Sequence, residues 1–448
     1  MFEAVIKDFA WVGLLLLMGA YLRAKVSILQ KLYIPTAVIA GFVGLILGPQ
    51  VLGAVSPVCI HWSEYMGQYA TPLLAMLFCV QFFGLKFDRK VMRQASAVWA
   101  IATIVISAQY LFAVPFVKAF GLPDGFAALP QSAFYGGHGI PGVVTGIWKG
   151  MGYWNPDEAF SIGTTFATIG LLYGVVGGII IINIAARKGW LADGDTVGQL
   201  TEEERTGYIK PENREKFMIG ITKGASIDPM AFHVAIMFAL MILSYSLLSF
   251  IKWLAANVSI FASFANLNVM VTALVVSLVA GSIASKTKLG NIIDKDSLTR
   301  CGCTALKFLI ASSVASTNLG VVVTYGIPIL VISVVLLAFT TLFCLLLAKL
   351  WIRTNWFEHG ILMLGGYTGV LATGLMLLRI ADPDMKTDAS VNVVTASPLW
   401  TLTSQNLYLA IVPMMMVTAE GFTRSCFISG GLIVGLLIFG FIFYRRKA

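Results

Sequence analysis

Runs of about 20 mostly apolar residues recur along almost the whole sequence, and each is long enough to cross a bilayer as a helix. Hydrophobic residues occupy 58% of the 448 positions and charged residues only 12%, whereas soluble proteins carry roughly 25% charged residues. A membrane β-barrel would instead show short segments of alternating hydrophobicity. The sequence therefore predicts an all-α polytopic membrane protein.

Eleven apolar spans are predicted. The first is interpreted as a retained helix rather than a signal peptide, because no small-residue cleavage site follows it. The predicted spans are residues 5–22, 33–52, 67–85, 95–119, 160–186, 231–251, 266–284, 301–323, 327–348, 400–418 and 427–443.

Lysine and arginine gather in every second connection between these spans. They follow the first, third, fifth, seventh and ninth spans and end the chain, whereas residues 53–66 contain none. Because this bias marks the cytoplasmic side of a membrane, the N-terminus is expected outside and the C-terminus inside. The net charge of +9 then reflects orientation in a cytoplasmic membrane, and no nucleic-acid partner is expected.

Two glycine-rich stretches interrupt the apolar pattern, and the predicted orientation holds only if neither crosses the membrane fully. One is YGGHGIPGVVTGIWK at 135–149, and the other begins at Glu358. Gly136 and Gly365 are 229 positions apart, and the second, third and fourth spans recur at offsets of 232 to 234 positions. Two halves of five spans would insert with opposite orientation, as in the inverted repeats of secondary transporters.

This reading gives the chain four parts in sequence, two of which contain a broken or re-entrant segment. The linker between the halves, with its TEEER and PENREK runs, is interpreted as a solvated tether. The parts are a first inverted repeat at 1–186 with its glycine-rich segment at 126–150, a cytoplasmic linker at 187–230, a second inverted repeat at 231–420 with its glycine-rich segment at 355–380, and an extra C-terminal span with a basic tail at 421–448.

The glycine-rich breaks favour a ligand site near the middle of the membrane. Non-helical backbone is tolerated there only where protein buries it or it lines a cavity, and helix ends exposed by a break attract ions. Close packing of helices through small residues is the alternative explanation. A phosphate-binding loop is excluded because GxxxxGK[ST] is absent, and the CGC pair lacks the partners of a zinc site.

Two charged or titratable residues in these segments have open interpretations. His138 is either a core histidine with a backbone partner, a substrate contact or a pH-sensitive group. Arg379 either reaches the cytoplasmic surface, pairs with Asp382 or Asp384, or binds a substrate carboxylate.

Sodium is the coupling ion that the polar residues of the spans suit best. All 22 acidic residues fall in loops, at span ends or at the edges of the broken segments, so no carboxylate is expected at membrane depth to carry a proton. Hydroxyl and amide oxygens are present instead, and Thr164, Thr165 and Thr168 belong to this group. Such hydroxyls often bond to their own helix, which is the alternative role.

The chain resembles the bacterial glutamate–sodium symporter family. The resemblance rests on GGHG at 136–139, TTFATIGLLYGVVGG at 164–178 and GGYTGVLATGLMLLRIADP at 365–383, with support from YIPTAVIAGFVG at 33–44 and AIVP at 410–413. It implies sodium-driven uptake of glutamate by a homodimer of elevator type, in which a transport domain moves against a static scaffold. Ile140 and Pro141 replace an expected threonine-glycine pair and Asn183 an expected proline, so another amino acid or small carboxylate stays open.

These considerations define two sets of candidate residues. No enzyme signature such as HExxH or GxGD is present, and no cofactor is expected beyond sodium. A proton-coupled or exchange carrier of another small organic anion remains the alternative function. The predicted substrate-contacting residues are Gly136, Gly137, His138, Gly139, Thr145, Gly365, Gly366, Tyr367, Thr368, Gly369, Thr373 and Arg379. The predicted sodium-contacting residues are Gln81, Ser312, Ser313, Ser316, Thr317 and Asn318.

Overall fold

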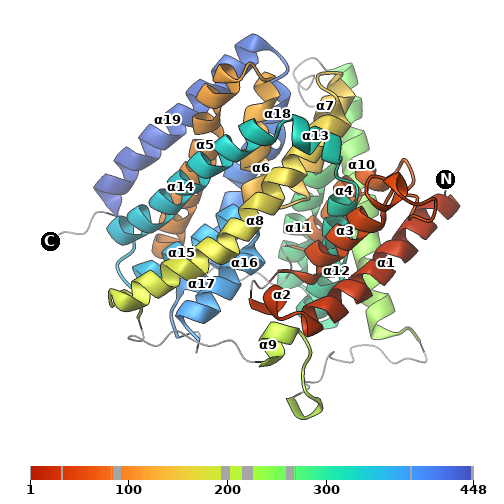
Figure 1. The fold of residues 1–448 in the computed structure, drawn as a ribbon. Helices are drawn as coiled ribbons and strands as arrows, with labels where there is room; N and C mark the ends of the chain where they lie inside the picture. Colours follow the sequence, from red (N-terminus) through yellow and green to blue (C-terminus); the bar gives the residue numbers. More distant parts are fainter. Residues whose placement is uncertain are drawn as a thin grey trace. The chain divides into compact units, whose positions relative to one another are not determined.

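The computed structural model describes residues 2–31, 34–81, 83, 92–192, 202–213, 226–258, 267, 269–383 and 386–444. Within these residues every regular element is helical, which confirms the all-α prediction. Eight helices of the described chain are long and apolar enough to cross a membrane (Figure 1). They are α1 (Phe2–Lys25), α3 (Thr36–Leu47, continued by a short turn to Ala54), α5 (Met92–Ala119), α8 (Pro156–Arg187), α10 (Pro229–Asn257), α11 (Val269–Lys286), α14 (Gly326–Trp351) and α19 (Ala419–Phe443).

The predicted spans at 67–85 and 301–323 are not single helices. In the first, α4 (Ala70–Phe78) ends early and turns follow to residue 81. In the second, α12 (Lys295–Ala315) stops and α13 (Leu319–Thr324) begins after three residues. The carboxamide of Asn318 accepts hydrogen bonds from the N–H groups of Gly320 and Val321. This N-cap starts a new helix, so the prediction of a continuous span was wrong here.

The predicted span at 400–418 starts too late in the sequence. The observed segment begins with α17 (Ala389–Trp400), continues through wider π-helical turns at 401–411, and ends with α18 (Val412–Met415). Its first part contains Asn392 and Thr395, which lower its hydropathy. Asn392 is nevertheless buried, with a hydrogen bond to His359. Hydropathy underestimates a membrane helix whose polar side chains find partners inside the protein.

The chain forms two compact units, and each is assembled from both halves of the sequence. The first unit contains Met1–Leu22, Pro35–Lys86 and Gly207–Ser316, and the second contains Arg23–Ile34, Phe87–Thr206 and Thr317–Ala448. Short helices α2 (Ser27–Lys31) and α9 (Glu202–Thr206) belong to the second unit. The predicted halves are therefore each shared between the two units.

Small residues and one buried acid organise the first unit, which holds α1, α3, α4, α10, α11 and α12. A β-carbon placed on Gly41 would lie 2.4 Å from the β-carbon of Val314, so α3 and α12 approach closely. The buried carboxylate of Asp8 accepts hydrogen bonds from the backbone of Ser63 (3.2 Å) and the hydroxyl of Tyr69 (2.7 Å). These bonds tie α1 to the loop before α4.

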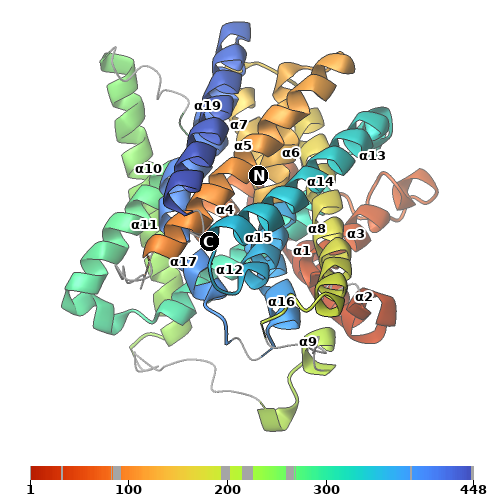
Figure 2. The ribbon, with the colours of Figure 1, turned by 90° about the vertical axis from the view of Figure 1, so that its left-hand side faces the viewer.

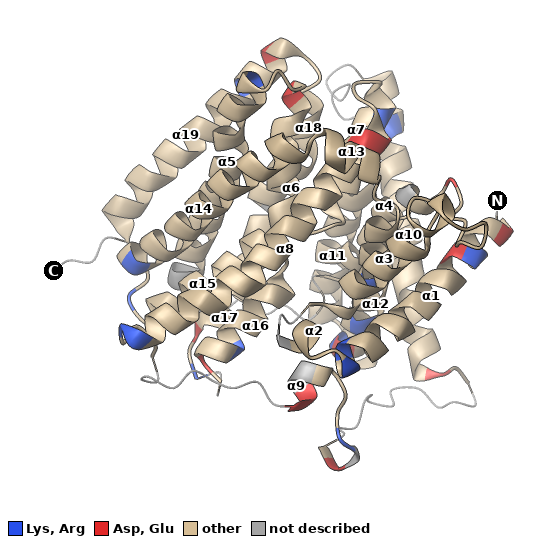
Figure 3. Ribbon diagram, in the orientation of Figure 1, with Lys and Arg blue, Asp and Glu red and all other residues tan. Residues whose placement is uncertain are grey.

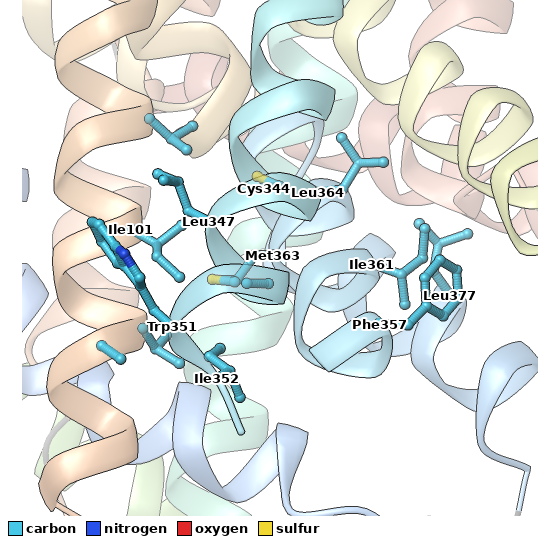
Figure 4. Packing of buried hydrophobic residues seen from close by; sticks show 14 of the residues in the cluster. Ile101, Cys344, Leu347, Trp351, Ile352, Phe357, Ile361, Met363, Leu364 and Leu377 are labelled. Carbon is cyan, nitrogen blue, oxygen red and sulfur yellow. The ribbon is translucent and has the colours of Figure 1, made fainter. Parts of the chain in front are cut away.

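The core of the second unit is a continuous apolar cluster. Ile101 of α5, Leu347 of α14 and Leu364 of α15 (Trp356–Thr368) belong to this cluster and are almost fully buried (Figure 4). Helix α19 packs against α5 along the same unit (Figure 2). This packing holds the glycine-rich segments on rigid neighbours.

Several helix ends that carry predicted cytoplasmic cations meet at one end of the second unit. The ammonium groups of Lys188 and Lys349 both lie over the ring of Trp190, at 5.0 and 5.9 Å. The hydroxyl of Tyr444 donates to Ser96, which places the end of α19 beside the start of α5. Figure 3 shows the charged residues mostly at helix ends and in connections. The cations at 86–91 and 445–447, much of the predicted linker, and Asp384 lie outside the described residues.

Candidate functional site

The first glycine-rich segment is a re-entrant hairpin made of α6 (Ala128–Gly136) and α7 (Ile140–Met151). Gly137 at the turn has φ +60°, a conformation that side chains with a β-carbon rarely adopt. The N–H of Gly125 donates to the hydroxyl of Tyr153 (3.0 Å), and a β-carbon on Gly125 would touch the ring of Trp148. The two outer ends of the hairpin therefore lie together.

The second glycine-rich segment forms a hairpin of α15 and α16 (Leu371–Ala381), with its turn at Gly369 and Val370. The short turn makes the two helices antiparallel, and glycines that face one another let them approach closely. A β-carbon on Gly365 would lie 2.6 Å from Cα of Gly374, and one on Gly374 would lie 2.2 Å from the carbonyl oxygen of Leu362.

The two hairpins enter the second unit from opposite ends and their tips meet. Helix α8 starts at Pro156, beside the open end of the first hairpin, and ends at Arg187, close to Trp190. The ring centroid of Trp190 is 5.4 Å from that of Trp356, which starts the second hairpin. At the tips, a β-carbon on Gly137 would lie 2.8 Å from a methyl group of Val370. The two breaks in the helical pattern are thus in direct contact, 233 positions apart in the sequence.

Glycines on one face of α8 allow both hairpins to pack against this helix. A β-carbon on Gly163 would overlap Pro141 of the first hairpin (2.5 Å), and one on Gly178 would overlap Leu377 of the second (2.5 Å). Between them, Gly170 and Gly174 lie against the backbone carbonyl and the hydroxyl of Thr368. The small-residue pattern of this span therefore serves close helix packing.

Polar side chains on α8 face two helix interruptions. The imidazole of His138, at the first hairpin tip, lies 3.0 Å from the hydroxyl of Thr168. The hydroxyl of Thr164 lies 3.0 Å from that of Thr317, and the N–H of Asn318 donates to Ser161 (3.1 Å). Thr317 and Asn318 precede α13 in the second unit, so the start of α13 also lies against α8.

The other predicted sodium-contacting residues occupy different places. Ser312 and Ser316, in the first unit, donate to carbonyls of their own helix, at Leu309 (3.0 Å) and Ser313 (3.2 Å). Ser313 is buried beside them. Gln81 is not near this end of α12, because the preceding Val80 faces Gly302. Ten helical residues separate Gly302 from Ser312, or roughly 15 Å along the axis.

The glycines of the predicted substrate set have contrasting surroundings. Gly136 faces Ile140 so closely that a β-carbon would overlap it (1.9 Å), and Gly369 faces the hydroxyl of Thr373 (2.9 Å). Together with Gly137 and Gly365, these residues meet a packing or backbone requirement. A β-carbon on Gly366 would have no atom within 4 Å.

The remaining predicted substrate residues are only partly gathered at the tips. Thr368 is buried there, and its hydroxyl donates to Leu364 (2.8 Å). Thr145 lies five positions beyond the start of α7 and bonds to Gly142 within the helix (3.3 Å). Arg379 is exposed and interacts near the open end of the second hairpin. Nine residues separate it from Val370, or roughly 13 Å.

A cavity of about 100 Å³ lies beside the hairpin tips, on the faces of α5 and α17. The ring centroid of Trp400 is 5.2 Å from that of Tyr135 and 5.9 Å from that of Tyr367, so three aromatic residues surround it. No charged side chain of the described residues lines it. The lining residues are Val98, Trp99, Ala102, Tyr135, Met363, Gly366, Tyr367, Leu371, Val393, Ala396, Ser397 and Trp400.

Two buried polar residues escaped the sequence analysis. The amide of Gln109 donates to the backbone carbonyl of Tyr367 (2.8 Å) and to the hydroxyl of Thr340 (2.9 Å), which fixes the second hairpin to α5 and α14. Gln109 could have been predicted from the sequence, because a side-chain amide inside an apolar span is unusual. Gln81 is another residue of this kind. Glu358 is fully buried on α15. Its place at a segment edge gave no sign of that burial.

A family model described as sodium/glutamate symporter matches residues 4–374, and the match ends within α16. Curated proteins give no match. Among solved structures, the chain is similar to a sodium proton antiporter from Methanocaldococcus jannaschii, with 15% identity over 91% of this chain and 98% of that chain and a TM-score of 0.41.

Proposed function

Because the chain belongs to the sodium/glutamate symporter family, we propose that it is a secondary active transporter that couples sodium entry to the uptake of glutamate or a related acidic amino acid. The observation that carries the proposal is the meeting of two re-entrant hairpins at Gly137 and Val370. Interrupted helices that meet near the middle of a membrane are where transporters bind substrate and coupling ions.

The order of elements supports an inverted repeat in this protein. Before the linker the chain forms α1, α3, α4, α5, the first hairpin and α8. After it come α10, α11, α12, α14, the second hairpin and the α17–α18 segment. The opposite entry of the hairpins is what two oppositely inserted halves would produce. An elevator motion of the hairpin-bearing second unit, within a homodimer, is the mechanism we infer from the family.

Sodium is proposed to bind where the α12–α13 break meets α8. Thr164 and Thr317 place two hydroxyl oxygens 3.0 Å apart, and Ser161 adds a third from the same face of α8. Hydroxyl and carbonyl oxygens are the ligands that hard cations prefer. Ser312, Ser313, Ser316 and Gln81 stay predictions for further sodium contacts in the first unit.

The proposed location is the cytoplasmic membrane of a bacterium, with the N-terminus outside and the C-terminus inside. The clustering of Lys188 and Lys349 around Trp190 supports one cation-rich side in the second unit. The open end of the second hairpin would then face the cytoplasm, and that of the first would face outward.

Proton coupling, with another small organic anion as substrate, is the second candidate function. Glu358 has no exposed surface; one carboxylate oxygen accepts from the N–H of Ala192 (2.8 Å) and the other has no partner among the described residues. The adjacent His359 is equally buried, with its ring between the carbonyl of Asn355 (2.8 Å) and Asn392 (2.9 Å). Buried carboxylates of this kind carry protons in other transporters.

Reconstituted protein distinguishes the two candidates. Liposomes with an inward sodium gradient and no proton gradient should accumulate labelled glutamate, and a proton gradient without sodium should not drive uptake. Equal uptake with and without sodium would reject sodium coupling, and uptake driven by protons alone would favour the second candidate.

A further inference from the structure

Buried polar atoms without a hydrogen-bond partner gather on two neighbouring elements of the second unit. On α6, both amide atoms of Gln131 and the hydroxyl of Tyr135 have no partner among the described residues. On the α17–α18 segment, the same holds for the indole nitrogen of Trp400, the hydroxyl of Thr401 and the carboxamide oxygen of Asn406. We call these five residues the polar seam.

Helix geometry brings the members of the polar seam onto facing surfaces. Gln131 and Tyr135 are four positions apart and share one face of α6. Thr401 and Asn406 are five positions apart in π-helical turns, whose repeat brings such a pair onto one face. The edge-to-face contact of Tyr135 with Trp400 joins the two surfaces, and both rings line the cavity beside the hairpin tips.

This group of unpartnered polar atoms indicates a place where a ligand binds. Buried polar groups in proteins almost always have a hydrogen-bond partner, and each exception needs an explanation. Hydration alone would satisfy the atoms, yet Tyr135 and Trp400 of the polar seam line a cavity whose aromatic walls favour an organic group over water. Extra π-helical turns are also frequent at functional sites.

We propose that the polar seam and the adjoining cavity bind the charged backbone groups of a zwitterionic amino acid, an assignment that rests on the proposed transport function. The indole of Trp400 can only donate, and with Tyr135 and the Gln131 amide it suits a carboxylate. The oxygens of Asn406 and Gln131 accept from an ammonium group, and the aromatic faces attract it further. With no charged side chain lining the cavity, a substrate that carries both charges fits better than a bare dianion.

The assignment moves the main substrate contacts from the glycine tips to α6 and the α17–α18 segment. Residues beyond Gly374 lie outside the family match, so the contribution of Trp400, Thr401 and Asn406 comes from this structure alone. The tips then shape one wall of the site, through Gly366 and Tyr367.

The test compares Tyr135→Phe and Gln131→Met with Tyr110→Phe in the purified full-length protein. Tyr110 is also a buried tyrosine, but its hydroxyl is partnered by Ser425 (2.6 Å) and it does not line the cavity. Removing an unpartnered polar group should leave thermal stability unchanged or raised, while the affinity for L-glutamate in saturating sodium falls about tenfold. Tyr110→Phe should instead melt earlier and keep the wild-type affinity.

A ligand comparison completes the experiment. Wild-type protein should bind L-glutamate about tenfold more tightly than glutarate, which lacks the amino group, and the two seam variants should reduce this preference. Unchanged affinities in both seam variants would overturn the assignment while leaving the transport proposal intact. Misfolding of both variants would overturn it as well, because their polar groups would then be structural. Wild-type protein that binds no amino acid would reject the transport function itself.

Discussion

Gly365 and Gly366 are adjacent in sequence, yet only one has room for a side chain. A β-carbon on Gly365 would lie 2.6 Å from Cα of Gly374 in the partner helix of the hairpin, whereas one on Gly366 would have no atom within 4 Å and would point toward the cavity. The pair therefore separates a glycine required for packing from a glycine that borders a cavity.

Substitution of these two glycines should give opposite results. Gly365→Ala is expected to lower the free energy of unfolding by about 1–3 kcal/mol, because the hairpin helices must move apart. Gly366→Leu should preserve stability but occupy the cavity, and should weaken substrate binding at least tenfold, or about 1.4 kcal/mol. Thermal melts and binding measurements on both variants check this. A stable Gly366→Leu protein with normal affinity would show that the cavity is not used by substrate.

Valine substitutions on α8 test the proposed sodium contacts. Thr164→Val and Thr317→Val keep the side-chain volume but remove one oxygen ligand each, so the sodium concentration for half-maximal uptake should rise about tenfold, a cost near 1.4 kcal/mol. Thr165→Val is the matched control, because the hydroxyls of Thr164 and Thr165 both donate to the carbonyl of Ser161 (3.0 and 2.7 Å), but within the described residues it is Thr164 that lies against Thr317. The proposed sodium position is wrong if all three variants keep the wild-type sodium dependence.

Glu358→Gln separates sodium coupling from proton coupling. The amide oxygen can still accept from the N–H of Ala192, and a neutral side chain has a smaller desolvation cost in this buried place. Sodium-driven uptake should therefore persist, with equal or greater thermal stability. Complete loss of uptake in a well-folded Glu358→Gln protein would instead assign proton transfer to this residue.

Impermeant thiol reagents test the proposed orientation. In a background without the six native cysteines, a cysteine at position 64 should react in intact cells. A cysteine at position 203, in the linker, should react only after the membrane is permeabilised, because the cation-rich side faces the cytoplasm. Labelling of 203 but not 64 in intact cells would reverse the topology.

Chain length and composition determined the helical class of this protein. Hydrocarbon thickness fixes how many apolar residues a crossing helix needs, and backbone groups in lipid must be satisfied within the helix. These two constraints act on local sequence, so α1, α5, α8, α14 and α19 could be predicted from their apolar runs. The glycine clusters GGHG and GGYTG also predicted an interruption at each hairpin, because a straight membrane helix does not require such clusters.

Tertiary structure alone decided which distant residues come into contact. Thr164 meets Thr317 across 153 positions, and nothing in either local sequence specifies that contact. Gln81 and Ser312 looked equivalent as polar residues in apolar spans, yet the segment of Gln81 packs against α12 at Gly302, roughly 15 Å along the helix axis from Ser312. The start of α17 and the unpartnered atoms of Gln131 and Trp400 could not be predicted from the sequence either. Whether a polar group is buried, and whether it finds a partner, depends on packing between distant segments rather than on its neighbours in the chain.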